Sequence, residues 1–216
     1  MNRQEQILQV AEKYGSTTDK LFMTIEEAEM LAIELAHRIA NSYPDVDCVV
    51  GIANGGLMAS SIVAQELNVP MEILDIRRRG SYFKRLVYRS ERLRAIVARL
   101  YRFPLVRFPM YWLMRTMETP IVKECHSVEN FDSIAIVDDA VESGKTLAAA
   151  VQVIADQSDT NPITAVLCCS REYSTPAIMP DIFMGRRIQH YPWSGNSPQY
   201  DEYIKWLKDR GIELSG

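Results

Sequence analysis

Hydrophobic positions follow two alternating patterns along the chain. Short continuous apolar runs are expected for strands buried on both faces of a parallel sheet, and they occupy residues 48–53, 71–76, 133–137, 163–169 and 181–188. Apolar residues at the spacing of an amphipathic helix recur in residues 2–14, 24–40, 57–67, 145–155 and 200–208. Strands alternating with helices predict an α/β fold, a parallel sheet flanked by helices.

Unusual chemistry follows the third of these apolar runs. Two carboxylates, Asp138 and Asp139, come directly after it, and a glycine-containing turn then opens the next helix. The turn is formed by Ser143, Gly144, Lys145 and Thr146. The N–H groups and positive dipole end of a helix start suit a phosphate, and adjacent carboxylates suit sugar hydroxyls or magnesium. Because ligands bind beyond the carboxyl ends of parallel strands, a binding site is expected here.

The Gly-Lys-Thr sequence of this turn also ends the nucleotide-binding P-loop, GxxxxGK[ST]. That pattern requires glycine at position 139, where this chain has Asp139. The segment is also too acidic to wrap a polyphosphate. Both observations disfavour the P-loop alternative.

Residues 134–147 resemble the signature of type I phosphoribosyltransferases that binds 5-phosphoribosyl-1-pyrophosphate (PRPP). The shared pattern is a hydrophobic strand, two acidic residues, two variable residues, an acidic or small residue, Ser/Thr, Gly, any residue and Ser/Thr. The resemblance implies that family's Rossmann-like fold, PRPP as substrate and Mg²⁺ as cofactor. It implies that Asp138 and Asp139 hold the ribose hydroxyls and, indirectly, the metal. It also implies that residues 143–146 hold the 5-phosphate and that Glu142 is the general base.

A second segment, residues 49–57, resembles the family's pyrophosphate loop. Glycine lets the main chain approach closely, so backbone N–H groups there can bind pyrophosphate oxygens. Asn54 stands where the family usually has Arg, Lys or Ser, which weakens the charge assistance. The pyrophosphate-binding residues that the resemblance implies are Asn54, Gly55, Gly56, Arg77 and Arg78. The implied reaction is displacement at the anomeric carbon with release of pyrophosphate.

Residues 172–198 resemble the small C-terminal hood that covers the acceptor in xanthine- and hypoxanthine-type enzymes. The sequence at 188–193, Ile-Gln-His-Tyr-Pro-Trp, has the Pro-Trp pair of those hoods. The acceptor-binding residues that this likeness implies are Ile188, Tyr191 and Trp193. One departure argues against a 6-oxopurine acceptor, because the lysine usual after the fourth strand is absent and Arg171 is the nearest cation.

The most basic part of the chain is a predicted insertion at residues 80–125. Residues 77–117 contain twelve Lys and Arg and one acid, a net charge of +11, and since the whole chain carries −4 the remainder carries −15. Helical periodicity over 82–102 and large apolar residues over 103–114 predict a basic amphipathic helical insertion. Such a stretch, 82–114, suits an anionic membrane surface. A lid over the active site and a dimer interface are the alternatives.

Three functions stay open from the sequence. The sequence favours phosphoribosyl transfer to a hydroxyl of a membrane-associated glycan or lipid-linked molecule, because of the insertion, and the other two functions are the alternatives. The hood favours a purine acceptor: xanthine, hypoxanthine or guanine. The third is a PRPP-sensing or RNA-binding regulator whose basic insertion contacts phosphates. Nucleic acid is the least favoured partner, because the aromatic residues of the insertion lie in an apolar run.

The length of 216 residues suits one phosphoribosyltransferase domain spanning 1–216. No apolar run approaches the roughly 20 residues needed to cross a bilayer. The N-terminal residues are polar, and the four cysteines have no metal-binding spacing. These features predict a cytoplasmic protein, peripheral at the inner face of the membrane if the insertion binds lipid. Dimers are common in the resembled family, which leaves a homodimer open.

Overall fold

The computed structural model describes residues 2–17, 19–78, 99, 120–125, 127–158, 160–170, 176–195 and 197–212, with the backbone alone at 77–78 and 123–125. The chain divides into two compact units, Met1–Asp75 with Glu124–Gly216, and Ile76–Lys123. The stretch 82–114, on which the membrane-surface hypothesis rests, lies outside the described residues except for Arg99.

The described helices follow the predicted ones closely. They are α1 (Arg3–Ser16), α2 (Ile25–Ser42), α3 (Leu57–Leu67), α7 (Lys145–Gln157) and α8 (Tyr200–Asp209). A capping box fixes the start of α1 at Asn2 and of α2 at Thr24, where side-chain oxygens accept backbone N–H groups that have no partner within the helix. The capping box at Thr24 confirms the helix start predicted there.

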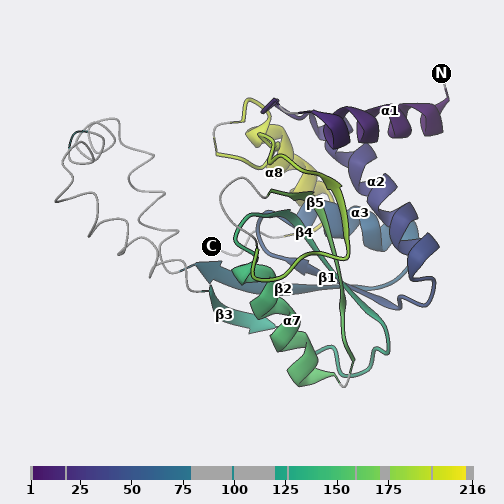
Figure 1. Ribbon diagram of the computed structural model, residues 1–216, viewed down its shortest axis with the longest axis vertical. Helices are drawn as coiled ribbons and strands as arrows, with labels where there is room; N and C mark the ends of the chain where they lie inside the picture. Colours follow the sequence, from purple (N-terminus) through teal and green to yellow (C-terminus); the bar gives the residue numbers. More distant parts are fainter. Residues whose placement is uncertain are drawn as a thin grey trace. The chain divides into compact units, whose positions relative to one another are not determined.

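The sheet has the strand order β3-β2-β1-β4-β5-β6 (Figure 1). Its strands are β1 (Cys48–Ile52), β2 (Met71–Arg78), β3 (Pro120–Cys125), β4 (Ile134–Val141), β5 (Ile163–Cys169) and β6 (Ile182–Gly185). β1 pairs in parallel with β2 and β4, and β5 pairs in parallel with β4 and β6. The order of strands reverses between β1 and β4, and ligands of α/β sheets bind at such a switch point.

Two strand predictions need correction, and one strand was not predicted. β4 runs to Val141, so the acidic pair lies within the strand and not in a loop after it, because pairing with β5 continues to Cys169. β6 ends at Gly185 rather than near 188, because the chain then turns toward the N-terminal segment, where the N–H of His190 donates to the carbonyl of Leu21. A further strand, β3, was not predicted from the sequence; it forms the sheet edge beside β2 and overlaps the end of the predicted insertion.

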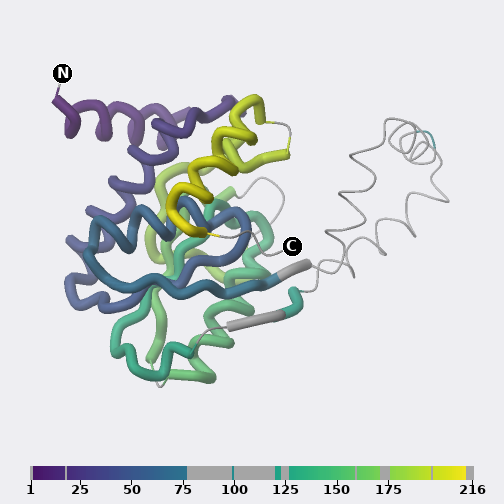
Figure 2. Tube along the Cα trace, turned by 180° about the vertical axis from the view of Figure 1, so that it is seen from behind, coloured from purple at the N-terminus to yellow at the C-terminus, as the bar shows by residue number. Residues whose placement is uncertain are grey.

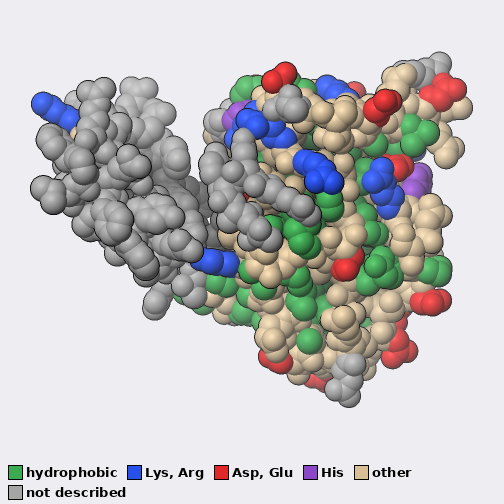
Figure 3. Space-filling view, viewed as in Figure 1, with side chains coloured by type: hydrophobic (Ala, Val, Ile, Leu, Met, Phe, Trp, Pro, Cys, Tyr) green, Lys and Arg blue, Asp and Glu red, His purple; other side chains and the backbone are tan. Residues whose placement is uncertain are grey.

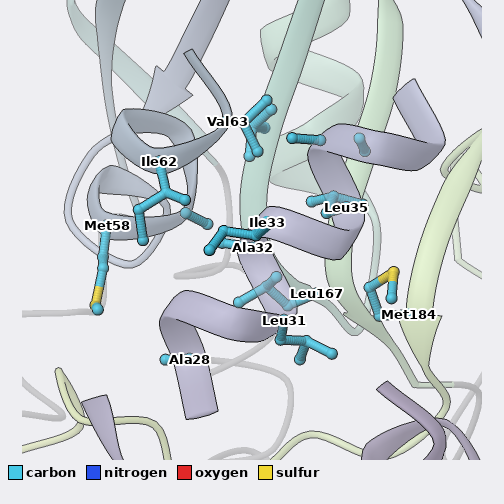
Figure 4. Close-up of a cluster of buried hydrophobic side chains, with 14 of the residues drawn as sticks. Ala28, Leu31, Ala32, Ile33, Leu35, Met58, Ile62, Val63, Leu167 and Met184 are labelled. Atoms are coloured by element: carbon cyan, nitrogen blue, oxygen red, sulfur yellow. The ribbon is translucent and has the colours of Figure 1, made fainter. Parts of the chain in front are cut away.

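The hydrophobic core lies where α1, α2 and α3 pack against the sheet (Figure 4). Leu31 and Leu35 of α2, Ile62 of α3 and Leu167 of β5 are all buried in it. Figures 1 and 2, which show opposite sides, place α7 on one face of the sheet and α2 and α3 on the other. This confirms the predicted α/β arrangement. Of the described helices, none is both long and apolar enough to cross a bilayer.

Candidate functional site

The loop after β1 and the end of β4 touch each other at the switch point. A Cβ on Gly55 would lie 2.5 Å from Oδ2 of Asp139, and one on Gly56 would lie 2.8 Å from the carbonyl oxygen of Val137. Any larger residue would collide, so glycine is what lets the loop lie directly against the acidic pair. The loop opens with a cis peptide bond between Ala53 and Asn54. The predicted pyrophosphate loop and the predicted ribose-binding carboxylates therefore meet in one place.

The acidic pair presents one buried and one half-buried carboxylate. Asp138 is 8% exposed, and its Oδ1 accepts the backbone N–H of Asp139 at 2.8 Å. A buried charge is costly unless it is hydrogen-bonded, so this contact helps to keep Asp138 in place. In the ladder, Asp138 lies opposite Val166 of β5. Pairing in the sheet thus fixes the backbone of both residues. A fixed backbone is what the two carboxylates would need in order to orient two hydroxyls of a ligand.

The turn that opens α7 has a conformation suited to glycine and to an anion. Gly144 is the N-cap, with φ +70° and ψ −2°, and no side chain caps this end of the helix. The helix start is also the positive end of the helix dipole, which suits an anion. The carbonyl of Ser143 accepts the N–H of Ala177 at 2.9 Å, which anchors the turn. Lys145 and Thr146 are half-buried at the same end of the helix. Their binding of a phosphate stays a prediction, supported by this geometry.

The predicted general base is accessible. Glu142 is exposed, and it lies in the chain between the end of β4 and the turn before α7. A carboxylate in that place can meet an acceptor that approaches the acidic pair from solvent. The role of Glu142 as a base is not tested by this geometry and stays a prediction.

The hood reaches the acidic pair directly. Nε1 of Trp193 donates to Oδ2 of Asp139 at 2.6 Å, and the hydroxyl of Tyr191 donates to the carbonyl of Asp139 at 3.3 Å. The rings of Tyr191 and Trp193 are stacked, with centroids 4.8 Å apart and planes 5° apart. Tyr191 is buried, and Ile188 is half-buried against the core. The sequence predicted that Ile188, Tyr191 and Trp193 contact the acceptor, and it did not predict the contacts of Tyr191 and Trp193 with Asp139.

A residue that the sequence did not single out completes this cluster. Tyr203 of α8 lies beside Trp193, with ring centroids 5.8 Å apart, and its hydroxyl donates to the carbonyl of Asn54 at 3.3 Å. Burial, followed by the nearby Asp139 carboxylate, raises the pKa of Tyr203 above its usual range. Its hydroxyl therefore stays protonated and remains a donor. A tyrosine at helical spacing is typical of a core position, so its sequence pattern gave no functional signal.

The segment before α2 joins the hood by backbone hydrogen bonds. The N–H of Met23 donates to the carbonyl of His190, and the N–H of His190 donates to the carbonyl of Leu21. The ring of His190 stacks on the ring of Phe22, with centroids 4.5 Å apart. Since these partners are more than 160 residues apart in the chain, no local pattern could have predicted that the N-terminal segment supports the hood.

The basic residues expected to bind pyrophosphate are only partly described. The backbone of Arg77 and Arg78 forms the last two residues of β2. Their side chains lie outside the described residues, as do all of Arg79 and Arg171. The roles assigned to them from the sequence stay predictions.

The acidic pair suits a magnesium site in which the protein supplies only some of the ligands. Within the described ranges, no group of three or more His, Cys, Asp and Glu side chains could hold a metal ion. Asp138 and Asp139 offer two adjacent carboxylates, and Mg²⁺ commonly completes its shell with water and substrate phosphate oxygens. The donors present therefore suit a magnesium ion brought in largely by a phosphorylated ligand.

Comparison with solved structures finds this architecture in phosphoribosyltransferases. The purine phosphoribosyltransferase from Pyrococcus horikoshii matches with a TM-score of 0.56 and 18% identity, over 82% of this chain and 95% of that one. The xanthine-guanine-hypoxanthine phosphoribosyltransferase from Helicobacter pylori matches with a TM-score of 0.55 and 13% identity, over 88% and 99%. A Neisseria gonorrhoeae protein with bound ppGpp matches with a TM-score of 0.53 and 16% identity, over 90% and 98%.

This chain therefore has the type I phosphoribosyltransferase fold. No family model matches its sequence, and the comparison with curated proteins gave no match either. At 13–18% identity, the structural likeness establishes the fold alone. The reaction and the acceptor are therefore proposed below from the residues of the candidate site.

Proposed function

We propose that this protein is a phosphoribosyltransferase that transfers the 5-phosphoribosyl group of PRPP to a purine base and releases pyrophosphate. The observation that carries the proposal is the direct contact between the loop of Gly55 and the carboxylate of Asp139 at the sheet's switch point. It unites two separate segments that resemble PRPP-binding motifs. The glycine turn before α7 belongs to the same motif as the acidic pair, and Gly144 comes five residues after Asp139.

Each part of the site has a role in this reaction. Asp138 and Asp139 accept the ribose hydroxyls, the N–H groups at the start of α7 bind the 5-phosphate, and the loop 54–56 binds pyrophosphate. A nitrogen of the purine forms a bond to the anomeric carbon as the bond to the pyrophosphate oxygen breaks, and Glu142 takes the proton from the purine. Mg²⁺ near the acidic pair would neutralise charge on the pyrophosphate. The rest of the catalysis is positioning and electrostatic stabilisation.

A purine is the better-supported acceptor. The Pyrococcus and Helicobacter proteins that share the fold are purine enzymes by name, and the hood sequence at 188–193 resembles that of purine enzymes. Transfer to a glycan or lipid-linked hydroxyl is the second candidate, and the charge of residues 77–117 is the observation that favours it. A regulator that binds RNA has less support, because the aromatic residues of the insertion lie in an apolar run rather than between basic residues. On the described surface of one face of the molecule, Figure 3 shows both acidic and basic side chains.

Calorimetry with PRPP and magnesium, followed by a pyrophosphate-release assay, tests the proposal. We expect PRPP to bind, and release to require guanine, hypoxanthine or xanthine. PRPP binding without purine-dependent release would refute the purine acceptor and favour the glycan or lipid-linked one, which flotation with anionic vesicles would then examine. An absence of PRPP binding would refute the phosphoribosyltransferase function itself.

Replacing Glu142 by glutamine tests the proposed base separately. The change keeps the size of the side chain and removes its ability to take a proton. We expect PRPP affinity to stay within about twofold of wild type and kcat to fall by about a hundredfold or more, the usual scale of general base catalysis. Glu66→Gln, at an exposed position of α3, is the control and should change neither. An unchanged kcat in Glu142→Gln would exclude this residue as the base.

A further inference from the structure

The hood touches the ribose-binding end of the site through Trp193. Its indole N–H donates to the carboxylate of Asp139 at 2.6 Å. We propose that Trp193 is a positioning residue, which holds the Asp139 carboxylate in the orientation that the ribose hydroxyls need. This inference rests on the proposed function, and adds to it a residue that acts through another and links the hood to PRPP binding.

The carboxylate of Asp139 is confined from two sides. On one side is the indole, which can only donate a hydrogen bond, and donation to an ionised carboxylate is short and strong. On the other side is Gly55, where a Cβ would lie 2.5 Å and 2.8 Å from the two carboxylate oxygens. With Oδ2 hydrogen-bonded and Gly55 packed against it, the group has little freedom to rotate.

The indole of Trp193 is itself held by aromatic neighbours. Tyr191 stacks on it in parallel, and Tyr203 lies tilted beside it. Since Tyr191 also donates to Asp139 and Tyr203 donates to Asn54, the three rings contact both the acidic pair and the loop after β1. One face and the N–H of Trp193 are already engaged in these contacts. This favours a positioning role over the contact with the acceptor that the sequence predicts.

Trp193→Phe removes the N–H and keeps an aromatic ring that can stack on Tyr191. Loss of a hydrogen bond to a charged group, together with misplacement of a reacting group, predicts a fall in kcat/KM for PRPP of about ten- to a hundredfold. We expect a lower kcat to account for most of this fall in kcat/KM, because the orientation of the ribose matters most as the bond to pyrophosphate breaks. Steady-state kinetics at saturating purine measures the two constants.

The chain contains a matched control in Trp206 of α8. Its Nε1 donates to Oε1 of Glu29 at 2.7 Å, also an indole–carboxylate hydrogen bond, but one that joins α8 to α2. Trp206→Phe should lower the unfolding temperature about as much as Trp193→Phe and leave kcat/KM within about twofold of wild type. Equal losses of activity in both variants, or wild-type kinetics in Trp193→Phe, would overturn the proposal.

The indole N–H signals in a ¹H–¹⁵N spectrum give a readout that needs neither activity nor a folded Trp193→Phe variant. The chain has three tryptophans, so Trp112→Phe and Trp206→Phe assign the Trp193 signal by elimination. We expect Asp139→Asn to shift that signal without ligand, and PRPP to shift it in the wild type. An unmoved signal in Asp139→Asn would refute the hydrogen bond. If Asp139→Asn shifts the signal but wild-type protein does not bind PRPP, the proposed function fails while the contact stands.

Discussion

Replacing Asp138 and Asp139 together by asparagine is expected to lower kcat/KM for PRPP by at least about a thousandfold. In the proposed reaction each carboxylate binds a ribose hydroxyl, and both lie near the anomeric carbon, where positive charge develops. The change would therefore remove orientation and electrostatic stabilisation at once. Loss of one stabilising group of this kind typically costs a hundred- to a thousandfold. Pyrophosphate release under saturating purine, with PRPP binding measured by calorimetry, determines how much of the loss is in binding.

The same double variant is expected to stay folded. Asparagine keeps a side-chain oxygen that can accept the N–H of residue 139, as Oδ1 of Asp138 does at 2.8 Å. The control removes two charges elsewhere, by Glu202→Gln with Asp209→Asn at exposed positions of α8, and should leave activity within about twofold of wild type. A double variant of the acidic pair with near-wild-type turnover would remove the basis for assigning it to PRPP.

Much of the fold could be predicted from local patterns. α3 and β5 begin and end at the residues that the apolar runs indicated, Leu57–Leu67 and Ile163–Cys169. Both elements are set by local chemistry: a turn of glycines before α3, and an apolar run of strand length for β5. The start of α2 followed from its capping box, in which Thr24 and Glu27 are only three residues apart. Where the determining contacts are local in the chain, the sequence alone was sufficient.

The features that were missed depend on partners distant in the chain. β4 continues past its apolar run because Ala140 and Val141 pair with Cys168 and Cys169 of β5. The hydrogen bond from Trp193 joins residues 54 apart, and that from Tyr203 joins residues 149 apart. Polar groups at the ends of the apolar runs indicated the candidate site. The side chains that support it depend on how residues 188–193 and α8 pack, and this packing has no local sequence pattern.

Gly144→Ala is expected to destabilise the protein far more than Gly211→Ala, and to weaken PRPP binding as well. Both glycines have a left-handed backbone, with φ +70° and +69°, and so both substitutions carry the same conformational cost of about 1–2 kcal/mol. Only at Gly144 would the new Cβ meet backbone atoms, 2.8 Å from the N of Ala177 and 2.9 Å from the N and O of Ile178. At Gly211 no atom of the part of the chain that the structure describes lies within 4 Å of the new Cβ.

The difference between the two variants therefore isolates the contact of the turn at residues 143–146 with residues 177–178. We expect denaturant unfolding to show a loss of about 1 kcal/mol for Gly211→Ala and about 3 kcal/mol or more for Gly144→Ala, since backbone atoms cannot move aside as a flexible side chain can. PRPP affinity should fall at least about tenfold in Gly144→Ala alone, because the turn that presents the N–H groups of α7 must shift. Equal destabilisation in the two variants would mean that this contact does not stabilise the turn. Unchanged PRPP affinity in Gly144→Ala would mean that the turn does not bind the 5-phosphate.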